Sequence, residues 1–285
     1  MFDTHCHLNF KAFRKNLNEV IDRARTDGVN YFVVPGTDLE TSKRAVKIAE
    51  KYGSYSPERC RGIYAAVGIH PHHVYQTQNY NSKLKSIIQE LEKLITHPKV
   101  VAVGEIGLDR HQYKITKYKS YLVDNEFVKV QKELLIEQIK LAVRYKKAII
   151  LHNRESTKEL LNILTTNYYR LTTNMVFHCC EPDDELFDFA IKHKIFIGVD
   201  GDVTYSQKKQ AFVKKVPLEL LVLETDSPYL IPKPLKNRSA FGWYRNEPKN
   251  LNIIAEFIAR KKNISISRLI ETTDNNSKKL FSIND

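Results

Sequence analysis

Histidines that are typical metal ligands occur close together at the start of the chain. His5 and His7 follow a short apolar run, and alternate side chains of an extended segment share a face. Both imidazoles are therefore expected to point to one side, while Cys6 points away. Such a pair can bind one divalent cation, but alone it is a weak signal, because a chance pair on a surface loop is about as frequent.

The same residue types end five further apolar runs. They are His70, His72 and His73, then Glu105 and Asp109, His152, His178, and finally Glu224 and Asp226. A buried imidazole or carboxylate without a partner is costly, so a ring of them indicates a shared counter-charge, most simply metal ions. Imidazole suits zinc or manganese, whereas carboxylates suit harder ions such as magnesium and can bridge two of them. The pattern predicts a binuclear centre whose metal (Mg, Mn or Zn) stays open.

The elements that must position these residues alternate along the chain. Apolar, β-rich runs begin at eight positions, namely Met1, Tyr31, Tyr64, Val100, Ala148, Met175, Ile195 and Leu220. Lysine-rich segments between them, such as 84–95 and 131–145, have helical apolar spacing. Alternation of this kind predicts parallel strands joined by helices. Eight strands in 285 residues favour an α/β fold of the TIM type, a (β/α)8 barrel forming one domain over 1–285, above an open doubly wound sheet.

Net charge and cysteine usage narrow the class of protein. Lys and Arg outnumber Asp and Glu by 45 to 33, and the resulting charge of +12 favours polyanions such as nucleic acid. A lysine-rich, merely solvated surface explains that charge about equally well. The cysteines, Cys6, Cys60, Cys179 and Cys180, form no regular framework, so reduced thiols in the cytoplasm are expected.

Several motifs are missing from the sequence. It has no secretory signal and no membrane-spanning run, and no obligate protein partner is evident. A GxxxxGK[ST] loop, a GxGxxG fingerprint and a GxSxG elbow are also absent, which disfavours nucleotide-driven motors, nicotinamide enzymes and serine hydrolases.

The chain resembles the TatD family of metal-dependent hydrolases. The motifs that carry the resemblance are MFDTHCHL, GIHPH, GEIGLD, LHNRES, FHCCEP, ETDSPYL, RNEP and TTDNNSKKLF, in family order over almost the whole chain. The resemblance implies a metallo-dependent hydrolase-like barrel and a two-metal deoxyribonuclease, often an exonuclease. Single-stranded DNA is then the expected substrate, with RNA as an alternative.

The resemblance also implies a role for each matching residue. One ion would be bound by His5, His7 and Asp226. The other would be bound by His152 and His178, and Glu105 would bridge the two ions. Asp226 and Glu105 are the expected catalytic residues. His70 is the expected substrate contact, and His72 is a weaker candidate that shapes the loop equally well. Arg154 either binds a phosphate oxygen or forms a structural ion pair.

The sequence departs from the family pattern at two motifs. An aromatic commonly follows GLD, but Arg110 stands there and opens a longer insertion, and FHCCEP carries Cys179 and Cys180, which are expected to be buried structural thiols. A loop over 232–248 carries Phe241, Trp243 and Tyr244, aromatics that suit a single strand or ordinary loop packing.

Two other functions remain open at this point. One is an amidohydrolase or esterase of the same fold acting on a carbonyl, such as an aminoacyl-tRNA ester. The other is a catalytically silent nucleic-acid-binding barrel. Four further histidines lie off the pattern of candidate ligands and are expected to be hydrogen-bonded side chains that bind no metal. They are His73, His97, His111 and His193.

Overall fold

Eight parallel strands form one sheet whose order in space follows their order in the sequence. The computed structural model describes residues 1–53, 62–77, 80–114, 122–168, 174–236 and 245–283, without the side chains of 75–83, 167–168 and 236. The strands are β1 (Phe2–Asp3), β2 (Tyr31–Pro35), β3 (Ile63–Val67), β4 (Val100–Asp109), β5 (Ala148–Arg154), β6 (Met175–Phe177), β7 (Phe196–Val199) and β8 (Leu221–Leu223).

Backbone hydrogen bonds join the segment that follows β1 to the end of β8 and to the segment that follows β8, and they close the sheet into a barrel. The amide of Thr4 donates to Leu223 O at 3.0 Å, that of Asp226 to His5 O at 2.9 Å, and that of His7 to Ser227 O at 2.8 Å. The prediction of a (β/α)8 barrel is confirmed, and an open doubly wound sheet is excluded, because such a sheet leaves its edge strands unpaired.

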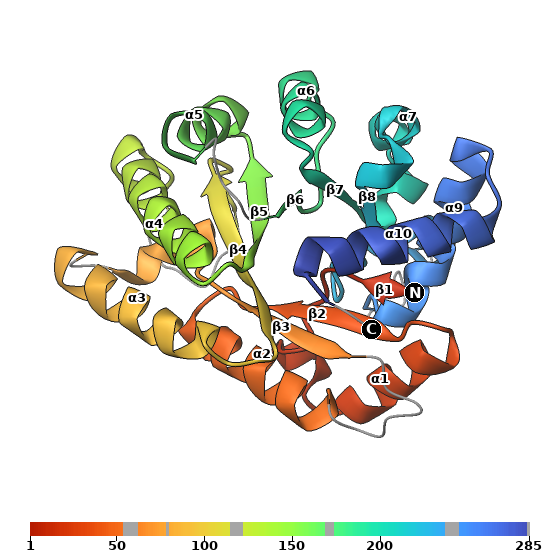
Figure 1. Ribbon diagram of the computed structural model, residues 1–285, viewed down its shortest axis with the longest axis horizontal. Helices are drawn as coiled ribbons and strands as arrows, with labels where there is room; N and C mark the ends of the chain where they lie inside the picture. The colour runs from red at the N-terminus through yellow and green to blue at the C-terminus, as the bar shows by residue number, and fades with distance from the viewer. Residues whose placement is uncertain (54–61, 78–79, 115–121, 169–173, 237–244, 284–285) are drawn as a thin grey trace.

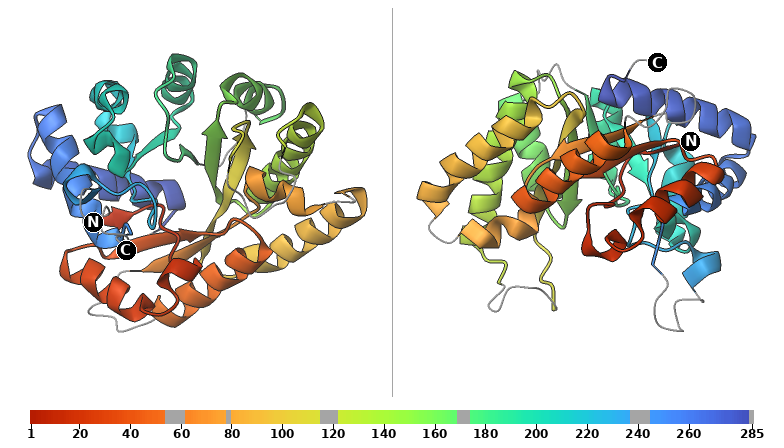
Figure 2. Two further views of the ribbon diagram at one scale, coloured as in Figure 1. Left: turned by 180° about the vertical axis from the view of Figure 1, so that it is seen from behind. Right: turned by 90° about the horizontal axis from the view of Figure 1, so that it is seen from below.

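Helices surround the barrel, as the views from opposite sides show (Figures 1 and 2). They are α1 (Leu17–Thr26), α2 (Leu39–Tyr52), α3 (Tyr80–Ile95), α4 (Asn125–Arg144), α5 (Thr157–Tyr168), α6 (Asp184–His193), α7 (Gln207–Lys215), α8 (Lys233–Lys236), α9 (Leu251–Lys262) and α10 (Ile266–Phe281). The predicted helical segments 84–95 and 131–145 fall almost wholly within α3 and α4. Among the described helices, none has both the length and the apolar character needed to cross a bilayer.

Local sequence explains where several helices begin. The side chain of Asp38 accepts from the amide of Thr41 at α2, and Asp124, Asp183 and Ser265 cap α4, α6 and α10 in the same way. These short oxygen acceptors satisfy amides of the first turn that have no partner inside the helix. Each capped helix therefore starts at a fixed point after the loop that leaves the barrel.

Alternate strand residues pack into two hydrophobic layers. In β2, Phe32 and Val34 belong to the large layer against the helices, whereas Val33 belongs to a smaller cluster inside the barrel. Leu280 and Phe281 of α10 join the inner cluster and close one end of the barrel. The other end, where the strands finish, is left for polar side chains.

Strand lengths differ from the sequence runs in an informative way. Strand β4 spans the whole predicted run from Val100, but β1 covers only Phe2–Asp3 and β8 only Leu221–Leu223. The polar residues of the first and last runs thus follow the strands themselves and lie on segments at the mouth of the barrel. Part of the insertion that opens at Arg110 lies outside the described residues, and so do Phe241, Trp243 and Tyr244 of the loop over 232–248.

Candidate metal centre

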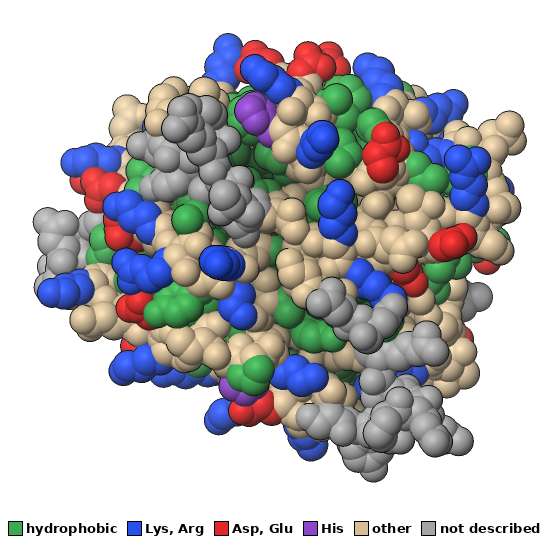
Figure 3. All heavy atoms as spheres, viewed as in Figure 1, with side chains coloured by type: hydrophobic (Ala, Val, Ile, Leu, Met, Phe, Trp, Pro, Cys, Tyr) green, Lys and Arg blue, Asp and Glu red, His purple; other side chains and the backbone are tan. Residues whose placement is uncertain are grey.

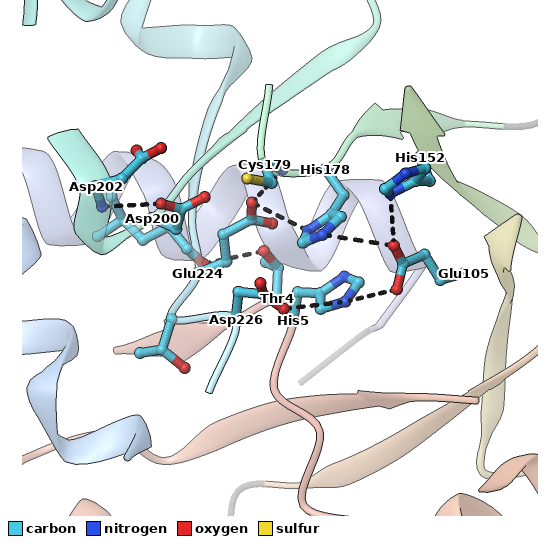
Figure 4. A network of polar contacts seen from close by, with 12 residues as sticks. Thr4, His5, Glu105, His152, His178, Cys179, Asp200, Asp202, Glu224 and Asp226 are labelled. Atoms are coloured by element: carbon cyan, nitrogen blue, oxygen red, sulfur yellow. Dashed lines mark hydrogen bonds and ion pairs between the residues drawn. The ribbon is translucent and has the colours of Figure 1, made fainter. Parts of the chain in front are cut away.

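Side chains from six strand ends meet at one mouth of the barrel (Figure 4). Seven residues singled out in the sequence contribute to this cluster, namely His5, His7, His70, Glu105, His152, His178 and Asp226. Glu105 is 3% exposed, so its carboxylate lies among the imidazoles rather than in water. The strand-end reasoning thus placed these seven residues together, and their individual roles remain predictions.

The two carboxylate oxygens of Glu105 face different histidines. Oε2 lies 3.4 Å from His5 Nε2 and 3.7 Å from His7 Nε2. Oε1 lies 2.9 Å from His152 Nδ1 and 3.7 Å from His178 Nε2. Glu105 therefore divides the cluster into two donor groups that share a single carboxylate, which is the arrangement expected of a bridging ligand.

The first group has the spacing of a tetrahedral ligand set. His5 Nε2 lies 3.2 Å from His7 Nε2, and Asp226 Oδ1 lies 3.4 Å from His7 Nε2 and 3.9 Å from His5 Nε2. Ligand atoms about 2.0 to 2.1 Å from a tetrahedral ion are separated by about 3.4 Å. The distances between the two imidazoles, and from them to Asp226 Oδ1 and Glu105 Oε2, run from 3.2 to 3.9 Å, so these residues fit a divalent cation.

A β-bulge in β4 directs Glu105 toward the mouth. The pairing of β4 with β5 shifts between Val103 and Ile106, so Gly104 and Glu105 have no partner on β5. The amide of Glu105 instead donates to Gly36 O at 2.9 Å. A side chain at Gly104 would place its Cβ 2.6 Å from Ile150, which explains the glycine. Bulges commonly redirect a side chain in this way next to a functional site.

Asp109 fixes the orientation of His152. Its Oδ2 lies 3.1 Å from His152 Nε2, so Nε2 keeps its proton, and Nδ1, which faces Glu105, is the nitrogen that would give up its proton to bind a cation. Burial lowers the pKa of His152, yet its hydrogen bonds with Asp109 and Glu105 raise that pKa to about 9. Asp109 also accepts from the amide of His111 and from the hydroxyl of Tyr113, both at 2.8 Å.

Glu224 holds His178 from the opposite side of its ring. Oε1 of Glu224 lies 3.2 Å from His178 Nδ1 and accepts from the amide of Cys179 (Figure 4). This pairing leaves His178 Nε2 to face Glu105. A Cβ on Gly198 would lie 2.5 Å from Glu224 Oε2, so the glycine makes room for the carboxylate.

A buried lysine lies behind this contact. Lys209 is 3% exposed, and its Nζ lies 2.7 Å from Asp202 Oδ2 and 3.5 Å from Cys179 Sγ. Although Cys179, Asp200 and Asp202 lie close enough to bind an ion, the ammonium group already supplies a cation there. Cys180 is buried as expected, whereas Cys179 is only partly buried and reaches the network through its backbone.

The charges of the cluster change the pKa values of its members. Burial raises the pKa of Glu105, but the charges of the surrounding histidines outweigh it and hold that pKa well below the ordinary value. Burial and the neighbouring His178 lower the pKa of His5 to about 3. Burial also opposes the charge of His178, yet Glu224 and Glu105 raise its pKa to about 10. A cation that binds His178 must therefore displace a proton.

The nitrogen of His70 that faces Glu105 carries a proton, unlike the nitrogen of a metal-binding histidine. Its Nδ1 accepts from the amide of His72 at 3.0 Å, so the proton lies on Nε2, which is 3.3 Å from Glu105 Oε1. A protonated nitrogen donates a hydrogen bond but cannot bind a metal. This geometry favours His70 as a donor to substrate, and it gives His72 the role of fixing the His70 ring through its backbone.

Arg154 lies at the rim, beside the segment that departs from the family pattern. Its Nη1 donates to the hydroxyl of Tyr113 at 3.1 Å, and its guanidinium lies 5.2 Å from the centre of that ring. Arg110, which stands where the family has an aromatic, turns away to pair with Glu159. Tyr113 therefore brings an aromatic ring to the mouth from a different position in the sequence.

Tyr229 and Phe10 lie on the side of His7. The ring of Phe10 stacks on His7 at 4.2 Å between centroids, and Tyr229 meets His7 edge to face at 6.3 Å. Burial and the charges of Asp226 and Glu105 raise the pKa of Tyr229.

Other predictions concerned histidines outside the cluster. His97 and His111 pair with Glu50 and Glu155 at 3.0 and 2.7 Å, as expected of surface histidines without a metal. Sequence reasoning listed Asp109 and Glu224 at strand ends but gave them no role, and it missed Tyr113, Tyr229 and Lys209. The strand-end position was a usable signal for the two carboxylates, whereas Lys209 sits in a lysine-rich helical segment that resembles a solvated surface.

Known proteins resemble this chain over its full length. The metal-dependent hydrolase YabD of Bacillus subtilis, itself described as uncharacterized, is 33% identical, with 100% of both chains covered. A protein of Edwardsiella piscicida named 3'-5' ssDNA/RNA exonuclease TatD is 32% identical, with 99% of both chains covered.

Solved structures agree with this relationship. The TatD homologue YjjV of Escherichia coli superposes with a TM-score of 0.83 at 28% identity, covering 100% of this chain and 98% of that one. An organophosphorus hydrolase from Deinococcus radiodurans shares the fold alone, with a TM-score of 0.62 at 12% identity and coverage of 98% and 92%.

A family model matches nearly the whole chain. The model described as TatD related DNase matches residues 2–282. Together with metal-dependent hydrolases that are about one third identical, this match shows that the chain is a hydrolytic enzyme. The chain belongs to the TatD family.

Proposed function

We propose that this protein is a nuclease that hydrolyses phosphodiester bonds of single-stranded DNA, or of RNA, with two divalent cations. His5, His7 and Asp226 would hold one cation, His152 and His178 the other, and Glu105 would bridge them. The observation that supports this proposal most strongly is the position of Glu105, whose two oxygens face separate groups of donors. Zinc, manganese and magnesium all remain candidates, because imidazoles and carboxylates are mixed in the set.

When bound, the cations would lower the pKa of the attacking water and neutralise charge on the phosphoryl group. The chain's own residues position and polarise the reactants. Asp226, at the edge of the first group, can orient the water and accept its proton. His70 carries its proton on Nε2 and can donate it in a hydrogen bond to a phosphoryl oxygen as charge develops there.

Arg154 would bind a phosphate of the substrate at the rim. Its side chain is exposed, and its Nη1 donates to the hydroxyl of Tyr113, which in turn donates to Asp109. A guanidinium matches phosphate oxygens with two parallel donors, so this position suits a phosphate next to the one that is cleaved. His72, which fixes His70 through its backbone, is the weaker candidate for a direct contact.

Charge and relatives support nucleic acid as the substrate. The net charge of +12 favours encounter with a polyanion, and on the face drawn in Figure 3 lysine and arginine side chains lie scattered rather than in one patch. Scattered charge attracts a strand without reading its sequence. Relatives named 3'-5' ssDNA/RNA exonucleases point to removal of nucleotides from the 3' end.

We also propose that the enzyme works in the cytoplasm as a single barrel domain. Cys6, Cys179 and Cys180 are free thiols in the described part of the chain, as suits a reducing compartment.

The test is a chelated preparation reconstituted separately with magnesium, manganese and zinc, and assayed on single strands labelled at the 5' end. Progressive shortening from the 3' end with at least one metal, and none with chelator, is expected. Release of amino acid from misacylated tRNA without cleavage of DNA would replace the proposal with the esterase alternative. Tight DNA binding without cleavage under any metal would instead support the alternative of a catalytically silent nucleic-acid-binding barrel.

A further inference from the structure

An aromatic side chain is exposed at the edge of the candidate metal centre. Tyr229 is 54% exposed, whereas its neighbour His7 is 3% exposed. Its ring meets His7 and Phe10 edge to face, at interplanar angles of 73° and 74°. Among the ring contacts of the described residues, none stacks a second ring on Tyr229.

The backbone holds this ring in a fixed relation to Asp226. The amide of Tyr229 donates to Asp226 O at 2.9 Å, and the amide of Asn246 donates to Pro228 O at 3.1 Å. The amide of Asp226 in turn donates to His5 O, in the segment that follows β1. The segment that supplies a candidate ligand therefore also supplies the ring, so the position of the ring relative to the cations would be fixed before substrate binds.

Arg154 and Tyr229 flank opposite sides of Glu105. Arg154 is linked through Tyr113 and Asp109 to His152, which faces Glu105 Oε1. Tyr229 instead contacts His7, which faces Oε2. A nucleic-acid strand whose scissile phosphate lies at Glu105 would have the phosphate-binding guanidinium of Arg154 on one side and the aromatic ring of Tyr229 on the other.

We propose that Tyr229 is a nucleobase subsite, where the base adjoining the scissile phosphate stacks on the exposed ring. This inference rests on the proposed nuclease function and adds to it the part of the substrate that is recognised. Every base has a flat aromatic face, so stacking tolerates any sequence but requires an unpaired base. Tyr229 would thus favour single strands over duplexes without selecting a sequence.

The test pairs a change in the protein with a change in the substrate. Binding of single-stranded oligonucleotides to the chelated protein is measured by fluorescence anisotropy, and kcat/KM is measured with the active metal. A set of substrates lacks one base at a time near the 3' end but keeps the sugar and phosphate. The variants are Tyr229→Ala, Tyr229→Phe, and Ile266→Ala, which removes an exposed apolar side chain on α10, at the opposite end of the barrel.

Tyr229→Ala is expected to weaken binding of the intact strand about tenfold, the usual effect of losing one stacked base. Tyr229→Phe should recover most of this loss, and Ile266→Ala should show none of it. On one abasic substrate the wild type should lose the same factor, and Tyr229→Ala should then cause no further loss.

Two results would overturn the inference. One is equal loss from Tyr229→Ala on intact and all abasic strands, together with weaker manganese binding, which would make Tyr229 a structural cover for His7. The other is no loss at all. A wild type that binds strands in this base-dependent way yet cleaves none would instead refute the nuclease function and leave the subsite standing.

Discussion

Asp109→Asn removes the charge from the carboxylate that orients His152 and leaves the side chain nearly the same size. In the wild type, Oδ2 accepts from the Tyr113 hydroxyl at 2.8 Å and lies 3.1 Å from His152 Nε2. Oδ1 accepts from the amide of His111 at 2.8 Å. An asparagine that keeps the His111 contact must place its NH2 group against two donors, so His152 loses the partner that sets its tautomer.

The expected effect is a roughly 10- to 100-fold weaker affinity for the metal, the usual result of losing a carboxylate behind a ligating histidine. This loss corresponds to about 1.4 to 2.7 kcal/mol. Removing one of the donors to Asp109, by Tyr113→Phe, should have a smaller effect, because Asp109 keeps its charge and its contact with His152.

The assay is titration of chelated protein with manganese, following bound ion by calorimetry or electron paramagnetic resonance. Asp184→Asn is the matched control, because the side chain of Asp184 is 92% exposed and lies on α6. Activity of Asp109→Asn should recover in part at high manganese. Wild-type affinity in a variant that melts at the wild-type temperature would refute the reasoning that Asp109 acts through His152.

Further expectations concern the candidate ligands, the packing behind them and the substrate. Glu105→Ala and Asp226→Ala should abolish hydrolysis while circular dichroism shows a folded barrel, and wild-type turnover by either would disprove its assigned role. Gly198→Ala should lower the free energy of unfolding by about 1 to 3 kcal/mol in urea titrations, because the added Cβ would lie 2.5 Å from Glu224 Oε2. Unchanged stability and metal affinity would show that Glu224 moves freely. Affinity for single-stranded DNA should fall steeply between 50 and 200 mM salt, as expected when several phosphates are neutralised, and a flat profile would argue against a polymeric substrate.

The barrel was predictable because its signal is repeated. Eight apolar runs separated by amphipathic segments leave few alternatives, and each run contains a strand of the sheet. Strand ends were harder to predict, because the whole run from Met1 to His7 is predicted as one extended segment, yet only Phe2–Asp3 pairs as a strand. Beyond Asp3 the path of the backbone is set by hydrogen bonds with Leu223 and Ser227, which are more than two hundred residues away in the sequence. Such distant contacts cannot be inferred from the local sequence pattern.

The candidate ligands were predictable for a related reason, since strand ends of a barrel meet at one face. The partners behind them were not. Lys209 is one of four lysines in a short helical segment, and only the fold shows that its ammonium group is buried between two aspartates. Which nitrogen of His70 and of His152 keeps its proton depends on which one meets the His72 amide or Asp109, which is a matter of geometry alone.

The most direct test of the two-metal centre is an anomalous difference map from crystals grown with manganese. Two peaks are expected, one among His5, His7 and Asp226 and the other beside His152 and His178, with Glu105 bound to both. A single peak, or none within reach of Glu105, would contradict the assignment of Glu105 as the bridge.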